Sequence, residues 1–269
     1  MKNVDKSNIF IKAPIQKIKN YVDSRDYEGN NLNLQVLKEY GVFIIKDAFD
    51  YKYIETLYDE YLLLMRNEII RKDDYHRTQV RISEEQKFTE VLRSNTFVEL
   101  SKKIFPHGAA LDLMRIVKKD ESNPAPVFLH SDAVYNIGWF EAYSCFIPLT
   151  HCSQDNGGLS FYPGTHNYGH LGDAGGIASI LPPDYPKLCP NVYPGDIIIM
   201  HAGTWHESGA YMRNGPRIYL EFSIRNSLDP AAKKLIHGFE EREWVLTISV
   251  DDLFSDSREQ RIRRLSNKK

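Results

Sequence analysis

Residues 195–206 read GDIIIMHAGTWH and predict a turn, a buried strand and a break that ends in a histidine. The run of four apolar residues after the Gly-Asp turn is typical of a strand in a protein core. His201 ends this strand, and His206 follows a Gly-Thr break. Histidines placed where a strand ends are candidates for metal ligation, which needs further ligands from other parts of the chain.

A second strand is predicted at residues 217–225, RIYLEFSIR, where polar and apolar residues alternate. Arg217, Tyr219 and Glu221 share one face of such a strand, and the aliphatic and aromatic residues share the other. One face would meet the core and the other could line a polar cavity. An arginine there could hold a carboxylate through two parallel hydrogen bonds. The alternative is an ordinary surface strand with scattered charges.

Further strands surround these two and predict an all-β core. They are separated by Pro, Gly, Asn and Asp, and lie at residues 111–118, 127–130, 139–149 and 158–162. Several short strands with long polar connections are typical of a sandwich or jelly roll. Residues 164–193 have no clear periodicity, and a loop of that length is usually functional or mobile.

The regions on either side of this core favour helices. Apolar residues at near-helical spacing predict an amphipathic helix at residues 53–70. A second helix is predicted at residues 83–104, with Ser83 as its N-cap. Residues 41–45 have the pattern of a short buried strand. We also expect a helix at residues 230–239, and at residues 251–269 either another helix or a frayed terminus.

The composition is that of an ordinary globular protein. Hydrophobic residues make up 42% and charged residues 26% of the 269 residues, which excludes a disordered or collagen-like chain. A net charge of −2 gives no indication of nucleic-acid binding. We expect no secretory signal and no membrane association, because no apolar run approaches the roughly 20 residues that span a bilayer. Cys145, Cys152 and Cys189 lack metal-type spacing and favour a reducing cytoplasm. The oligomeric state is unknown.

His130 and Asp132 form a His-x-Asp motif. Residues two apart on an extended chain point to the same side, so the two side chains could bind one ion. By itself the motif is equally consistent with a loop histidine beside a turn aspartate. Together with His206, it would give two histidines and one carboxylate. That set suits non-haem Fe(II), because coordination positions remain open, although zinc could occupy the same residues.

Several short motifs follow one another along residues 108–226 in a fixed order: His130-Ser131-Asp132, Asn156-Gly157-Gly158-Leu159, Pro163-Gly164-Thr165-His166, Gly195-Asp196, His206 and Arg217. This ordered set resembles the phytanoyl-CoA dioxygenase family. In that family an arginine lies about eleven residues beyond the distal histidine, and here 217 − 206 = 11. The resemblance is close over residues 108–226 and loose in the N-terminal part.

The resemblance implies a dioxygenase that depends on Fe(II) and 2-oxoglutarate and is built on a double-stranded β-helix, a jelly-roll or cupin-like core. It implies that His130, Asp132 and His206 are the iron ligands and catalytic centre, and that Arg217 binds the distal carboxylate of 2-oxoglutarate. A small-molecule substrate would be hydroxylated, or otherwise oxidised by hydrogen abstraction, with O2 as cosubstrate and succinate and CO2 as products. Related halogenases replace the carboxylate ligand with a small residue, so Asp132 favours hydroxylation over halogenation.

Four residues near this set have weaker support. His201 is a rival for the distal ligand, but the arginine spacing favours a structural role for it. His166 is expected to fix the entry of the long loop. Arg115 is predicted to bind a substrate or cosubstrate acid, or else to lie on a strand surface. Tyr219 shares the face of Arg217 and is predicted to donate to the cosubstrate or line its pocket.

The chain is thus predicted to be one domain, residues 1–269, of a mainly β class with flanking helices. Residues 1–107 would be a mostly helical part that packs on the core, residues 108–226 the double-stranded β-helix, and residues 227–269 a helical C-terminal extension. Two other functions remain open. One is a metal- or ligand-binding jelly roll without redox turnover. The other is zinc-dependent hydrolysis or isomerisation, in which Arg217 has no obvious role.

Overall fold

The computed structural model describes residues 15–67, 79–81, 86–134, 139–169, 181–229, 232 and 234–238. No helix within these residues has the length and apolar character needed to cross a membrane. The described helices are α1 (Ile15–Ser24), α2 (Leu34–Tyr40), α3 (Tyr51–Arg66), α4 (Gln86–Thr89) and α5 (Asn95–Ile104), with short 3-10 helices η2 (Glu90–Arg93), η3 (Asp132–Val134), η4 (Gln154–Asn156) and η5 (Thr165–Tyr168).

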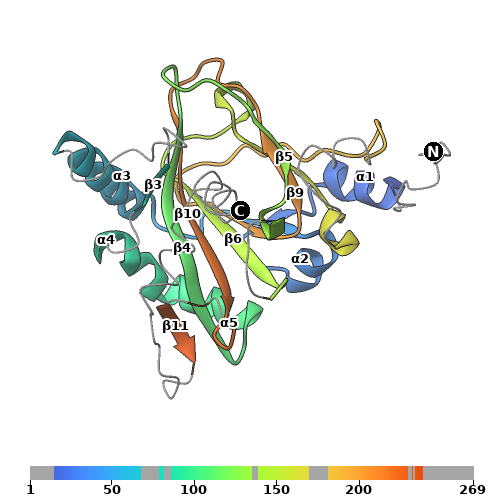
Figure 1. The fold of residues 1–269 in the computed structure, drawn as a ribbon, viewed down its shortest axis with the longest axis horizontal. Helices are drawn as coiled ribbons and strands as arrows, with labels where there is room; N and C mark the ends of the chain where they lie inside the picture. The colour runs from blue at the N-terminus through green and yellow to red at the C-terminus, as the bar shows by residue number, and fades with distance from the viewer. Residues whose placement is uncertain are drawn as a thin grey trace, which may run out of the picture.

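The strands form a large and a small sheet. They are β1 (Glu28–Gly29), β2 (Val42–Ile45), β3 (Gln79–Arg81), β4 (Gly108–Lys119), β5 (Val127–His130), β6 (Ala142–Pro148), β7 (Leu159–Tyr162), β8 (Ile197–His201), β9 (Trp205–Ser208), β10 (Arg217–Asn226) and β11 (Lys234–Gly238). The large sheet has the order β1-β2-β8-β6-β10-β4-β11, with β3 beside β4, and the small sheet has the order β5-β9-β7. Helices α3 and α4 lie on one side of the large sheet and the small sheet lies on the other (Figure 1).

Strand β10 lies between β4 and β6, and its two faces meet different surroundings. Leu220 and Phe222 face the helices, where the Phe97 ring of α5 meets the Phe222 ring edge-on with centroids 4.9 Å apart. Tyr219 lies on the other face and belongs to the same buried cluster as Phe161 of β7. The predicted alternation of this strand is therefore confirmed.

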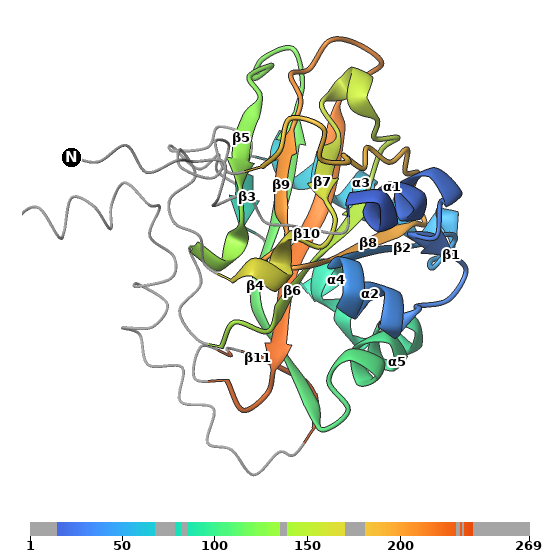
Figure 2. The same cartoon turned by 90° about the vertical axis from the view of Figure 1, so that its right-hand side faces the viewer.

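The polar face of β10 is buried rather than exposed to solvent. Arg217 and Glu221 are each only 3% exposed, because the small sheet covers this face. The alternative of an ordinary surface strand is wrong. Figure 2 looks onto the small sheet, strands β5, β9 and β7, with the large sheet behind it.

The helix predicted at residues 53–70 is confirmed in its described part as α3. Asp50 caps it, because its carboxylate accepts hydrogen bonds from the N–H groups of Lys52 and Tyr53. The single helix predicted at residues 83–104 is wrong, since α4, η2 and α5 follow one another there. The chain is extended at Ser94, whose hydroxyl caps α5 by accepting from the N–H of Phe97. Ser83 lies outside the described residues.

The ends of the chain differ from expectation in two ways. The strand predicted at residues 41–45 is confirmed as β2, and it joins the large sheet together with β1, which was not predicted. Residues 234–238 form strand β11 rather than part of the predicted helix, because the beginning of β4 offers an antiparallel partner to them. The helix expected at residues 251–269 lies outside the described residues. The described end of the long loop is tied to β7 by two hydrogen bonds between the backbones of Leu188 and Phe161.

Candidate metal and cosubstrate site

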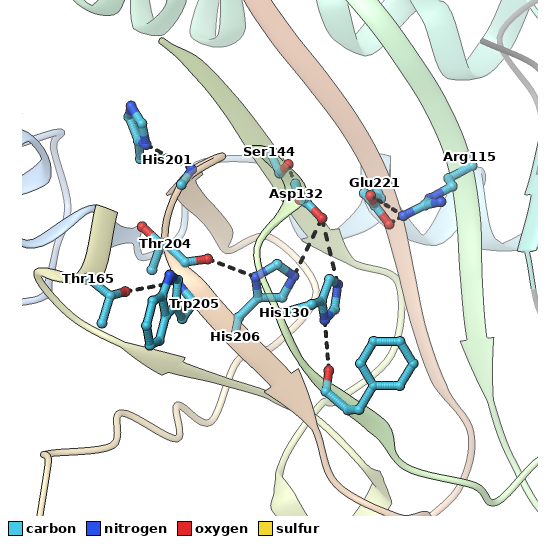
Figure 3. Close-up of polar contacts among 12 residues, drawn as sticks. Arg115, His130, Asp132, Ser144, Thr165, His201, Thr204, Trp205, His206 and Glu221 are labelled. Atoms are coloured by element: carbon cyan, nitrogen blue, oxygen red, sulfur yellow. Dashed lines mark hydrogen bonds and ion pairs between the residues drawn. The ribbon is translucent and has the colours of Figure 1, made fainter. Parts of the chain in front are cut away.

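The two predicted histidine ligands lie on neighbouring strands of the small sheet. The antiparallel pairing of β5 and β9 places His130 directly opposite His206. Their ring centroids are 4.3 Å apart. Asp132 follows β5 and begins η3, so its carboxylate lies beside both rings (Figure 3).

The three side chains converge through specific atoms. The Nε2 atoms of His130 and His206 each lie 3.7 Å from the same Asp132 Oδ1 atom. The His130 Nδ1 atom lies 2.8 Å from the carbonyl oxygen of Phe128, and the His206 Nδ1 atom lies 3.0 Å from that of Thr204. A carbonyl can only accept, so both rings carry their proton on Nδ1. In the neutral form of each ring, the Nε2 atom then carries the lone pair that can bind a metal.

The charges of this group suit a divalent cation. Loss of hydration, reinforced by the neighbouring His206, lowers the pKa of His130 to about 4. Burial opposes ionisation of Asp132, but the two histidines and a 2.7 Å hydrogen bond from the Ser144 hydroxyl hold the pKa of Asp132 below its ordinary value. A neutral histidine and a carboxylate are the forms that bind metals. Within the described residues, His130, Asp132 and His206 are the one group of three ligating side chains close enough to share an ion.

Arg217 lies in the gap between the sheets without an acidic partner. Its guanidinium makes no hydrogen bond or ion pair within the described residues, and its Nε atom is buried and unpaired. Its central carbon lies 5.3 Å from the centre of the Tyr219 ring. A buried, unpaired guanidinium is costly in free energy. The predicted role of Arg217, to bind a carboxylate of the cosubstrate, fits this environment.

Arg115 is already occupied by another carboxylate. It lies opposite Glu221 in the pairing of β4 with β10. Its Nε and Nη2 atoms donate to the two carboxylate oxygens of Glu221 at 2.9 and 2.6 Å. Such bidentate pairs hold a guanidinium in a fixed orientation. Binding of an external acid by Arg115 stays a prediction, and so does contact of Tyr219 with the cosubstrate.

His201 and His166 form a second pair, away from the first. Their ring centroids are 5.0 Å apart. The His201 Nδ1 atom accepts a hydrogen bond from the N–H of Gly203, and the His166 Nε2 atom lies 2.9 Å from the carbonyl oxygen of Lys38. These contacts join α2, η5 and the end of β8, as expected for structural histidines.

Two buried polar residues near this site, Ser144 and Lys119, were not predicted from the sequence. Ser144 lies on β6, whose residues are all buried, so no alternation shows which face meets Asp132. Lys119 ends β4 and is 2% exposed. A lysine at the end of a predicted strand is ordinarily read as a solvated terminus. Its burial depends on β9, which the sequence analysis did not predict as a strand.

Two facing sheets with a His-x-Asp motif and a distal histidine between them define the class of double-stranded β-helix metalloproteins. The family model "Phytanoyl-CoA dioxygenase (PhyH)" matches residues 37–219, which is more than half of the chain. The chain belongs to this family. It is an enzyme of the iron- and 2-oxoglutarate-dependent dioxygenase class, as the order of its motifs predicts.

Solved structures with the same fold share little sequence with this chain. SnoN from nogalamycin biosynthesis, in complex with Fe3+, alpha ketoglutarate and nogalamycin RO, is 16% identical, with a TM-score of 0.61 over 72% of this chain and 82% of that chain. EctD from S. alaskensis with bound Fe is 14% identical, with a TM-score of 0.62 over 74% of this chain and 78% of that one.

HygX from Streptomyces hygroscopicus, with nickel, 2-oxoglutarate and hygromycin B bound, is 11% identical, with a TM-score of 0.58 over 72% of this chain and 86% of that chain. These likenesses confirm the predicted double-stranded β-helix. A comparison with curated proteins gives no match.

Proposed function

We propose that the protein oxidises a small molecule by hydrogen abstraction, with His130, Asp132 and His206 as the iron ligands and Arg217 as the residue that binds 2-oxoglutarate. The observation that carries this proposal is that the two Nε2 atoms and a carboxylate oxygen of Asp132 lie close enough together to share one ion. When bound, iron and 2-oxoglutarate supply the activation of dioxygen, with succinate and CO2 as products.

The chain's own residues position these groups. Backbone carbonyls fix the ring orientation of both histidines, and the Ser144 hydroxyl fixes the carboxylate of Asp132. Outer partners of this kind raise metal affinity by orienting the ligands. We also propose that Asp132, as a carboxylate ligand, favours hydroxylation over halogenation.

Arg217 is buried beside apolar and aromatic side chains. Phe146, Phe161 and Tyr219 are buried in one cluster between the sheets. An arginine among such side chains interacts more strongly with a carboxylate than it would in water. The buried environment therefore supports a role in binding an acid that is enclosed by the protein.

The proposal is tested by adding Fe(II) and 2-oxoglutarate to the apoprotein without oxygen and recording the visible spectrum. We expect a weak metal-to-ligand charge-transfer band in the natural protein, and its loss in Arg217→Ala and His206→Ala. Matched controls are Arg213→Ala, which changes an exposed arginine, and His201→Asn, which changes a histidine of the second pair. Both controls should keep the band.

The same samples decide between the alternatives. Succinate formed with oxygen and a substrate supports the oxygenase. A band without succinate across a broad substrate screen would favour a binding protein that has no turnover. Zinc in protein purified under reducing conditions, with iron unable to bind, would favour hydrolysis or isomerisation. We also propose a cytoplasmic location, which rests on the cysteine pattern of the sequence.

A further inference from the structure

Lys119 is a buried lysine directly beside Arg217. The pairing of β4 with β10 places the two residues opposite each other. Paired residues of neighbouring strands project to the same side of a sheet. Both side chains are buried, at 2% and 3% exposed, and the Lys119 Nζ atom reaches the Ser208 hydroxyl of β9 at 2.9 Å. Lys119 therefore crosses the gap between the two sheets.

Neither cation has an acidic partner within the described residues. The Lys119 ammonium donates to two neutral oxygens, the Ser208 hydroxyl and the Gly209 carbonyl at 2.5 Å. Glu221 shares the face of Arg217 on β10, but Arg115 already binds both of its oxygens. Two cations buried side by side without an anion are unfavourable. Burial first, and then the Arg217 charge, lowers the pKa of Lys119 to about 7.

The turn beside Lys119 is shaped to admit its long side chain. Gly157 has a φ angle of 78°, a conformation that favours glycine. A Cβ atom at this position would lie 2.4 Å from the Lys119 Cδ atom and 2.8 Å from the Gly209 carbonyl oxygen. The first glycine of the Asn-Gly-Gly-Leu motif thus leaves the space that the Lys119 side chain occupies.

We propose that Lys119 is a second cationic residue of the cosubstrate site, which binds the distal carboxylate of 2-oxoglutarate together with Arg217. This inference rests on the proposed function. It explains why two cations are buried together and why both lack an acid. The competing explanation is structural: Lys119 would only tie β4 to the end of β9 through Ser208 and Gly209.

The experiment compares two keto acids that differ only at the proposed contact. 2-Oxopentanoate has a methyl group where 2-oxoglutarate has its distal carboxylate. The dissociation constant of each acid is measured on the iron-loaded protein without oxygen, by calorimetry and by the visible band. In Lys119→Met we expect 2-oxoglutarate to bind about 10- to 100-fold more weakly, as for loss of a charged hydrogen bond. The affinity for 2-oxopentanoate should not change.

Three further variants separate charge from structure. Lys119→Gln keeps a hydrogen-bond donor for Ser208 and Gly209 but removes the charge. It should therefore weaken the binding of 2-oxoglutarate as much as Lys119→Met does. Lys119→Arg keeps the charge and should restore part of the affinity. The matched control is Lys118→Met, which changes the preceding residue of β4, paired with Asp120 rather than with the site. It should leave both affinities unchanged.

The outcomes distinguish this inference from the proposed function. Equal weakening of both keto acids, or unchanged affinity for 2-oxoglutarate in Lys119→Gln, would overturn the role of Lys119 while leaving the oxygenase intact. Failure of the natural protein to bind iron and 2-oxoglutarate would overturn the proposed function itself. Iron content measured in every variant shows whether the three ligands remain in place. If Lys119→Met does not fold, Lys119→Gln and Lys119→Arg carry the test.

Discussion

His130 and His206 face each other with ring centroids 4.3 Å apart, and His166 and His201 form a second buried pair with centroids 5.0 Å apart. In the first pair both Nε2 atoms point to one oxygen of Asp132. In the second pair no carboxylate takes part among the described residues. Contact between two histidines is therefore not enough for a metal site. A carboxylate and ring nitrogens that face it are also needed.

The second pair is surrounded by aromatic rings and backbone. The His201 ring lies 5.1 Å from that of Phe140 and 5.2 Å from that of Tyr143, measured between centroids. Burial, and then His166, lowers the pKa of His201 to about 3. This pair fills space and joins α2 to β8, whereas the first pair lies beside the carboxylate of Asp132.

The largest expected effect is on iron affinity, when the carboxylate beside the first histidine pair is removed. Asp132→Ala removes the shared carboxylate, so we expect iron affinity to fall by more than about 100-fold, since loss of an outer partner alone costs 10- to 100-fold. Iron per chain after desalting, together with succinate release, measures this. His201→Asn is the control in the second pair and should retain iron. Loss of iron in the control, with retention in Asp132→Ala, would reverse the assignment of the two pairs.

A smaller effect is expected when the carboxylate stays but loses its support. Ser144→Ala removes the 2.7 Å hydrogen bond to Asp132 Oδ2 and should weaken iron binding about 10- to 100-fold. Competition with a chelator of known affinity measures the change. Ser160→Ala, at a buried serine of β7 that contacts Cys189, is the control. Equal weakening in both variants would point to a general loss of packing.

The second pair should respond in stability rather than in metal binding. Gly41 has a φ angle of 75°, and a Cβ atom there would lie 2.4 Å from both His166 Nδ1 and Thr204 Oγ1. Gly41→Ala should lower the free energy of unfolding by about 1–3 kcal/mol through overpacking, besides the cost of its backbone conformation. Gly215→Ala has the same backbone problem, with a φ angle of 79°, but no atom within 4 Å.

Urea denaturation of these two glycine variants isolates the packing term. Gly41→Ala should be the less stable of the two, and the folded part of the sample should still bind iron. If both variants lose equal stability, the contact with His166 contributes nothing beyond the backbone conformation.

A further effect is expected in the pH dependence of the metal-free protein. The pKa values of about 4 for His130 and about 3 for His201 lie below the ordinary value of about 6.5. Below pH 6.5 the unfolded chain binds protons that the folded chain does not. Stability should therefore fall as the pH falls from about 6.5 toward 4. His201→Asn should reduce this slope, as measured by urea denaturation at several pH values, and an unchanged slope would contradict the expectation.

The sequence was sufficient to predict the strands that carry their own apolar pattern. Strand β5 has the predicted bounds, and β4, β7, β8 and β10 differ from the prediction only at their ends. Strand β9 was not predicted, although it carries His206. Its residues, Trp205-His206-Glu207-Ser208, have no apolar alternation, and they become a strand because β5 and β7 pair with them on both sides. Tertiary pairing, which the local sequence does not encode, decides such cases.

The candidate site was predictable where a motif marked it. His130, Asp132 and His206 come together as expected, and their assignment as iron ligands stays a prediction until metal binding is measured. Lys119 and Ser144 were not found, because their partners, Ser208 and Asp132, lie on other elements. The break at Ser94 was readable, since serine is a common N-cap and the apolar residues of α5 begin three positions after it, at Phe97.

The polar contacts of the two facing sheets join residues that are far apart in the chain. Lys119 and Ser208 are separated by 89 residues, and Arg115 and Glu221 by 106. A nascent chain that has left the ribosome only as far as β8 has two of the three proposed ligands and lacks Arg217, the proposed residue for the cosubstrate carboxylate. Contacts of such long range form late in folding. Iron would then enter a finished fold rather than direct its assembly, and metal loading would be a step of maturation that follows synthesis.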